Sequence, residues 1–140
     1  MPPDKSIPGS VQDWLVRAKG HLALAQQPKP AGAFWEDQCF LAQQAAEKAI
    51  KAILVFLALD FPRRHDLDAL RNLVPNDWQV KTEHADLATL TEWAVEARYP
   101  GDWPDATEAD ARAAVEQARA VWESIQADFL RHGFTIEETS

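Results

Sequence analysis

CFLAQQAAEKAIKAILVFLAL, residues 39–59, is the stretch of sequence that decides the fold. When these residues are placed on a helix at about 100° per residue, they form two apolar stripes on opposite faces. One stripe predicts a packed core and consists of Ile50, Ile53, Leu54 and Leu57. The other predicts contact with a second subunit or a neighbouring loop and consists of Val55, Phe56 and Leu59.

Polar side chains share the core stripe of this helix. Going back from Ile50, the stripe passes through Glu47 and Gln43 and reaches Glu36. An unpaired polar or charged group is costly to bury, so these side chains need partners. The long helix therefore predicts a core, a partner surface and a candidate site together.

Capping residues and helix breakers mark the other elements. Ser10 with Asp13, and Thr107 with Asp110, each predict a capping box. Asp66 is a good N-cap for a short helix. Pro62 is the expected stop of the long helix, and Gly133 that of the last one. The expected helices cover about residues 10–27, 34–59, 66–74, 85–97 and 107–133, and residues 76–83 are expected to form a polar loop.

The pattern predicts an all-α fold. No segment has the alternation of a strand, and four of the expected helices are long enough to pack against one another. We expect an up-and-down antiparallel four-helix bundle with an additional short helix. Residues 10–133 would form the bundle, residues 1–9 a disordered tail, and residues 134–140 a frayed C-terminal tail.

Composition narrows the function classes. The formal net charge of −8 argues against high-affinity, non-specific nucleic-acid binding, which depends on a basic surface. The longest unbroken apolar run, residues 52–59, is far shorter than the ~20 residues that span a bilayer. One cysteine excludes an internal disulfide, and no signal peptide pattern is present. We expect a cytoplasmic protein without a membrane partner.

The common catalytic, cofactor and metal motifs are absent from the sequence. It has no glycine-rich phosphate loop, no nucleophile elbow and no Cys or His pair at zinc spacing. The run Glu83-His84-Ala85-Asp86 lies beside an expected helix start, where acidic residues serve as caps. Cys39 belongs to the inner stripe and is expected in the core. The sequence therefore predicts no catalytic residue, metal or cofactor.

Arg98 is the charged residue with the most demanding position. It continues the apolar line of Leu87, Leu90 and Ala94 at the end of the expected helix 85–97. A buried guanidinium requires an acidic partner. Glu47 is the first candidate and Glu36 the second. We expect Glu47 and Arg98 to form a structural polar pair, and the alternative is an anion site lined by Arg98.

Cations gather around one end of the long helix. Arg63, Arg64 and His65 precede the helix capped by Asp66, where backbone N–H groups also favour anions. A solvated surface is the simpler interpretation of these side chains, and a phosphate site is the functional one. The full set of candidate ligand-binding residues is Lys48, Lys51, Arg63, Arg64, His65 and Arg98.

Four segments, in order along the chain, resemble the HEPN domain family (higher eukaryote and prokaryote nucleotide-binding). They are Arg17-Ala-Lys19 with Leu22, residues 44–52 with Glu47, Lys48 and Lys51, His65-Asp66-Leu67, and Ala97-Arg98-Tyr99-Pro100-Gly101. The resemblance implies an all-α bundle, commonly a homodimer. It also implies a frequent partnership with a small nucleotidyltransferase in a two-component, toxin–antitoxin-like system.

Many members of this family are metal-independent RNases that use an Arg, four to six intervening residues and a His. This sequence departs from that pattern, because Trp103, Pro104 and Asp105 occupy the positions after Arg98 where the His would fall. Arg17 and His21 are separated by only three residues. We therefore expect a homodimeric binding or regulatory module that engages a nucleotide, a nucleotidyltransferase, or both. The alternatives are an RNase toxin with a degenerate active site and a structural dimerisation adaptor without a ligand.

Overall fold

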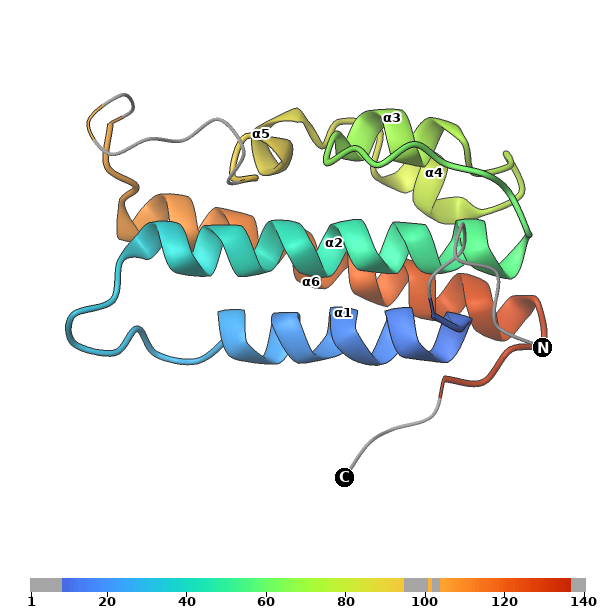
Figure 1. The fold of residues 1–140 in the computed structure, drawn as a ribbon, viewed down its shortest axis with the longest axis horizontal. Helices are drawn as coiled ribbons and strands as arrows, with labels where there is room; N and C mark the ends of the chain where they lie inside the picture. Colours follow the sequence, from blue (N-terminus) through green and yellow to red (C-terminus); the bar gives the residue numbers. More distant parts are fainter. Residues whose placement is uncertain (1–8, 95–100, 102–103, 137–140) are drawn as a thin grey trace.

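The fold was obtained as a computed structural model, which describes residues 9–94, 101 and 104–136. Within these residues the chain is all-helical, as predicted, with no strand. Three long helices, α1, α2 and α6, dominate the structure, and three short ones lie between α2 and α6 (Figure 1). Their bounds are α1 Val11–Ala25, α2 Trp35–Phe56, α3 Leu67–Asn72, α4 Gln79–Glu83, α5 Ala88–Thr91 and α6 Glu108–Arg131.

The bundle follows an up-and-down path. Figure 1 shows α1 running antiparallel to α2, and α6 running in the same direction as α2. The segment that carries α3, α4 and α5 returns along the opposite face of α2 from α1, and so occupies the fourth position of the bundle. Helix α2 packs against α1, α6 and the returning segment, and is the central element of the fold.

The return segment differs from the expected single helix at residues 85–97. In the described part of that stretch, residues 85–94, the only helix is α5, Ala88–Thr91. Leu87 and Leu90 are buried as predicted. The Leu67 N–H donates to Thr91 Oγ1 at 3.0 Å, so a side-chain bond ties α3 to this segment. Over residues 85–94 one short helix, linked to α3 by a side chain, therefore takes the place of the start of the expected longer helix.

Two of the predicted caps form as capping boxes. Ser10 Oγ accepts from the Asp13 N–H, and the Asp13 carboxylate accepts from the Ser10 N–H, both at 3.1 Å. Thr107 and Asp110 make the same reciprocal pair at the start of α6. Asp66 Oδ1 accepts from two N–H groups in the first turn of α3. These local signals correctly located three helix starts.

The long helix ends earlier than predicted, before Pro62. Ala58 adopts the left-handed conformation (φ 55°). Its N–H donates to the Val55 carbonyl at 3.1 Å, and the Leu59 N–H donates to the Leu54 carbonyl at 2.8 Å. These two bonds form a Schellman motif. Helix α6 ends in the same motif at Gly133 (φ 79°), as predicted.

The expected polar loop at residues 76–83 contains the short helix α4. Its first turn is capped by Asp128 of α6, which is fully buried. The Gln79 N–H donates to Asp128 Oδ1 at 2.9 Å, and the Val80 N–H donates to Oδ2 at 3.0 Å. A carboxylate from a distant helix therefore supplies the cap that the local sequence lacks.

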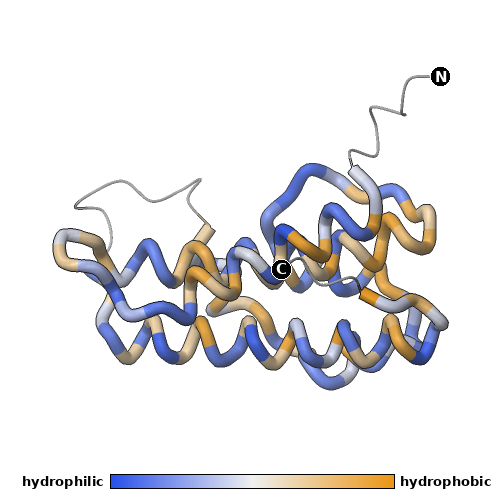
Figure 2. Tube along the Cα trace, turned by 90° about the horizontal axis from the view of Figure 1, so that it is seen from below, coloured by the Kyte–Doolittle hydropathy of each residue, from blue (hydrophilic) through white to orange (hydrophobic). Residues whose placement is uncertain are grey.

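The core follows the inner stripe of α2. Ile50, Ile53, Leu54 and Cys39 have no exposed surface, as predicted, whereas Leu57 is only half-buried. Strongly apolar residues gather toward the end of the bundle at which α2 ends (Figure 2). No helix in the described part of the chain has the length and apolar character needed to cross a bilayer.

Candidate functional site

The central helix α2 carries a buried polar network around Glu47. Glu47 Oε1 lies 2.7 Å from His65 Nδ1 and accepts from Gln43 Nε2 at 3.1 Å. Glu47 Oε2 accepts from Lys51 Nζ at 3.0 Å. Gln43 also donates to the His65 carbonyl at 3.1 Å, and so fixes the loop between α2 and α3. Gln43 and Glu47, two of the polar residues on the predicted core stripe, thus have hydrogen-bond partners in this network.

The Lys51 side chain makes its contacts within the protein. Its side chain is 9 % exposed and forms an ion pair with Glu47. The ammonium also lies 5.9 Å from the centre of the Trp14 ring and 5.7 Å from that of Phe61, which are cation–π distances. Trp14 and Phe61 meet edge to face. Lys51 is therefore a structural residue of the seam between α1 and α2.

Arg98, the expected partner of Glu47, lies outside the described residues. Glu36, its second candidate partner, accepts a hydrogen bond from the Ala106 N–H. This bond joins the start of α2 to the segment before α6. Both expected carboxylates therefore have hydrogen-bond partners among the described residues.

A second polar group lies on the seam between α1 and α2. Lys48 Nζ is 2.7 Å from His21 Nε2. Arg17 is four residues before His21, one turn away on the same face of α1. We call Arg17, His21 and Lys48 the cationic cluster. A cleft of about 340 Å³ adjoins the cluster and is lined by Gly9, Asp13, Trp14, Arg17 and Lys48.

Burial and neighbouring charges perturb two members of the cationic cluster. Partial burial lowers the pKa of His21, and the positive charges of Lys48 and Arg17 lower it further. Partial burial also lowers the pKa of Lys48; Glu47 opposes this shift, whereas Arg17 and Lys51 add to it. Both shifts arise because positive charge is crowded at a partly desolvated site. An anion would relieve this crowding.

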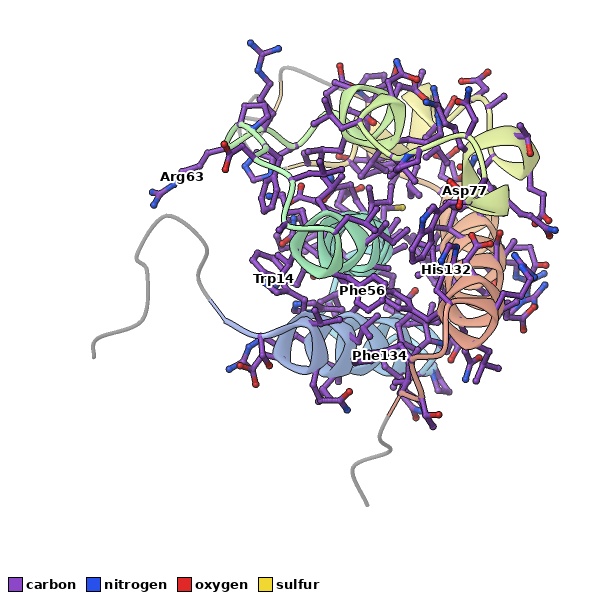
Figure 3. All side chains as sticks on the ribbon, turned by 90° about the vertical axis from the view of Figure 1, so that its right-hand side faces the viewer. Trp14, Phe56, Arg63, Asp77, His132 and Phe134 are labelled. Atoms are coloured by element: carbon purple, nitrogen blue, oxygen red, sulfur yellow. The ribbon has the colours of Figure 1, made fainter. Side chains whose placement is uncertain are left out.

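The structure separates the residues that the sequence grouped as one ligand site. Lys48 belongs to the cationic cluster, whereas Lys51 and His65 belong to the Glu47 network. Arg63 and Arg64 are exposed, and Arg63 extends from the loop before α3 away from the helices (Figure 3). Arg17 and His21 were not predicted as ligand residues. Their spacing of four residues on α1 was the available signal, but only the packing of α1 on α2 brings Lys48 to them.

The expected partner surface at the end of α2 is partly used within the chain. The ring of Phe56 packs against Trp78, Phe129 and Phe134, with ring centres 5.3–5.9 Å apart. Figure 3 labels Phe56 and Phe134. Phe134 belongs to the segment expected to be a frayed tail, and it is half-buried here. Val55 and Leu59 are half-buried. Phe56 thus has the neighbouring-segment contact that the sequence left open as an alternative.

The acidic run before α5 has structural contacts. Asp86 Oδ1 accepts from the Ala88 N–H at 3.1 Å. Asp86 lies one residue before Leu87, which is the N-cap of α5. Glu83 instead accepts from Ser124 Oγ of α6 at 2.8 Å. Partial burial lowers the pKa of His84, partly opposed by Glu83 and a backbone hydrogen bond. Among the described residues, no three His, Cys, Asp or Glu side chains are grouped as metal ligands would be.

Comparison with known proteins identifies the family. The HEPN domain model matches residues 11–128, which include all three long helices except the last residues of α6. The fold is similar to the crystal structure of TT1696 from Thermus thermophilus, with a TM-score of 0.72 and 26% identity, covering 84% of this chain and 97% of that one. It is also similar to ST0689, an archaeal HEPN homologue, with a TM-score of 0.62 and 29% identity, covering 85% and 97%.

No curated protein sequence matches the chain significantly. The family match spans most of the chain, and the resemblance noted in the sequence is therefore confirmed. The chain belongs to the HEPN domain family.

Proposed function

We propose that this protein is a homodimeric HEPN-type binding or regulatory module that engages a nucleotide, a partner nucleotidyltransferase, or both, in a two-component system of the toxin–antitoxin kind. The observation that carries this proposal is the cationic cluster. Arg17 and Lys48 lie together beside a cleft, on a chain whose net charge is −8. Positive charge concentrated against that background favours an anionic ligand.

The residue types of the cluster suit phosphate. An Arg guanidinium offers paired N–H donors to phosphate oxygens, and a Lys ammonium acts as a compact point charge. Trp14 gives the same cleft an aromatic wall. Aromatic side chains are common platforms for nucleobases. A cleft with cations and an aromatic wall therefore supports a nucleotide better than it supports an inorganic anion alone.

The other cationic residues contribute in different ways. Arg63 and Arg64 are exposed on the loop before α3, where they offer contacts to an acidic partner surface. Arg98 remains a candidate ligand residue in this proposal. Lys51 and His65 act through Glu47, which positions the loop that carries the two arginines.

A panel of nucleotides tests ligand binding directly. The purified protein is titrated with nucleoside mono-, di- and triphosphates and followed by thermal unfolding and calorimetry. A ligand present at about 100 times its dissociation constant adds about 2.7 kcal/mol to the free energy of unfolding. Lys48→Gln should lower the affinity about tenfold and so reduce this shift by about half. Arg112→Gln, an exposed arginine on α6, should retain the full shift.

A separate experiment tests the partner and the alternatives. Co-expression with the nucleotidyltransferase encoded nearest to this gene should give a complex that Arg63→Glu with Arg64→Glu weakens. Cleavage of a mixed RNA pool without metal would instead favour the RNase alternative. Absence of nucleotide, partner and RNA effects would contradict the proposal and favour the ligand-free adaptor.

A further inference from the structure

We propose that Arg17, His21 and Lys48 bind the doubly charged terminal phosphate of a mononucleotide, and that His21 takes up a proton from solvent when the phosphate binds. This inference rests on the proposed function, because it assumes a nucleotide ligand, and it adds the position, the charge state and the proton step. Two of the residues concerned, Arg17 and His21, lie on α1 and were not among the ligand residues predicted from the sequence.

The contact between Lys48 and His21 fixes the position of the proton on the imidazole. A lysine ammonium has three donors and no acceptor. A separation of 2.7 Å between Lys48 Nζ and His21 Nε2 therefore requires that Nε2 accepts. His21 is then neutral and carries its proton on Nδ1. The cluster then holds two positive charges and one uncharged ring.

The surroundings of His21 explain why it is neutral. The charged groups that act on it are Lys48 from α2 and Arg17 from α1, and both are positive. Together with partial burial they lower the pKa of His21. A dianion between Arg17 and Lys48 would reverse the sign of the local field. Lys48 would then donate to a phosphate oxygen, and Nε2, released from Lys48, would bind a proton and donate as well.

The charge balance selects the kind of phosphate. After proton uptake the cluster carries three positive charges, and the Asp13 carboxylate in the same cleft carries one negative charge. The net charge of two balances a terminal phosphate of two negative charges better than a phosphodiester of one. The cleft of about 340 Å³ lies near the lower end of small-ligand sites, which begin at roughly 300 Å³. Its size favours a mononucleotide over a longer chain, with Trp14 beside the base or sugar.

Calorimetry in two buffers of different ionisation enthalpy measures the proton step. Adenosine 5′-monophosphate tests the nucleotide, and sulfate tests the anion, because sulfate remains dianionic near neutral pH and takes up no proton itself. The wild-type protein should take up a fraction of one proton with each ligand. Adenosine 3′,5′-cyclic monophosphate keeps the base and sugar but has a singly charged diester. Its affinity should be lower than that of adenosine 5′-monophosphate by a factor of about ten or more.

Three variants and one control assign the residues. His21→Gln keeps an acceptor for Lys48 but cannot titrate, so it should bind sulfate with no proton uptake. Arg17→Gln and Lys48→Gln should each lower the affinity for both ligands about tenfold. Arg112→Gln should change neither affinity nor proton uptake. Circular dichroism checks that each variant remains folded, and Arg17 is exposed, so its replacement leaves the core intact.

The outcomes separate this inference from the proposed function. If adenosine 5′-monophosphate binds but Arg17→Gln retains full affinity, the cluster is not the site, although nucleotide binding stands. If His21→Gln retains the proton uptake, the proton step is wrong. If neither sulfate nor adenosine 5′-monophosphate binds to the wild-type protein, the inference fails, and the nucleotide panel and co-expression decide the proposed function independently.

Discussion

Ala58 shows how one backbone conformation ends the central helix. It has a positive φ of 55°, a region that costs a residue with a side chain roughly 1 kcal/mol or more, whereas glycine adopts it freely. Gly133 occupies the equivalent position at the end of α6. The two helices therefore end in the same way with different residues.

Exchange of these residues gives opposite predictions. Ala58→Gly should raise the free energy of unfolding by up to about 1 kcal/mol, and Gly133→Ala should lower it by a similar amount. Urea unfolding followed by circular dichroism measures both. A control is Gly20→Ala in the middle of α1, where glycine has no left-handed φ and alanine should stabilise. Destabilisation by Ala58→Gly would contradict the account of this helix end.

Glu47 is the residue on which the buried network depends. Its side chain is 4 % exposed, and it pairs with a lysine that is 9 % exposed. Glu47→Gln removes the negative charge and leaves the Lys51 ammonium without an ionic partner, which should cost about 3–5 kcal/mol. Urea unfolding measures this loss. Glu108→Gln is the control: it breaks an exposed pair with Arg112 and should cost about 1 kcal/mol or less. Equal losses of unfolding free energy in the two variants would exclude a special role for Glu47.

The sequence could predict these residues only in part. Glu47 was expected to pair with Arg98, which lies outside the described residues. Among the described residues Glu47 forms an ion pair with Lys51. Lys51 and His65 were expected to bind a ligand, but both contact Glu47. This pairing was not predicted, because the sequence does not show which cations a buried carboxylate will contact. The contact of Lys48 with His21 depends on how α1 lies against α2, which periodicity does not determine.

At the scale of elements, helices with local caps were predicted and the helix with a distant cap was not. Ser10 and Asp13, like Thr107 and Asp110, are three residues apart, so their reciprocal bonds can be inferred from the sequence. The cap of α4 comes from Asp128, which is 49 residues after Gln79. No local signal marks such a cap. The early end of α2 was missed for a related reason, because alanine is not a usual helix terminator.

Removal of the Asp128 carboxylate should release α4. Asp128→Ala leaves the Gln79 and Val80 N–H groups without acceptors. The loss of these two hydrogen bonds should lower the free energy of unfolding by about 2–4 kcal/mol. Hydrogen exchange should show faster exchange of the α4 amides before the rest of the bundle is affected. Glu123→Ala, on an exposed face of α6, is the control and should leave these amides protected. Unchanged protection in Asp128→Ala would show that α4 does not need this cap.

At the scale of the whole molecule, we expect stability to fall as the pH is lowered. The folded chain holds the pKa of His21 and His84 below their ordinary value of 6.5. The unfolded chain therefore binds more protons than the folded one below about pH 6.5, and the free energy of unfolding rises with pH there. This contribution is present above that pH and is lost as the pH falls through the folded-state pKa values.

Urea unfolding at about pH 7.5 and about pH 5.5 measures this effect. The double variant His21→Gln with His84→Gln should lose less stability between the two conditions than the wild-type protein. His132→Gln is a suitable control, because His132 is stacked on Trp78 near the surface. The same loss in the double variant and the wild-type protein would mean that these imidazoles are not responsible.

The proposed homodimer depends on the surface at the end of α2. Val55 is half-buried in the single chain, and we place it in the proposed dimer contact with Leu59 and the edge of Phe56. Val55→Glu should convert the dimer to a monomer in light scattering, because an unpaired carboxylate is costly to bury. Leu24→Glu on α1, where the leucine is 60% exposed, is the matched control. A dimer that survives Val55→Glu would exclude this surface.

The cap provided by Asp128 also has a consequence for the order in which the chain becomes structured during synthesis. The packed pair of α1 and α2 is complete in sequence by Phe56, and its contacts are close along the chain. The acceptor for the first turn of α4 lies near the end of α6, so this turn stays open until almost the whole domain has left the ribosome. Closing it requires a loop of nearly fifty residues, which slows the step relative to local contacts. Helix α6 is therefore needed to complete a helical turn that lies about fifty residues earlier in the chain.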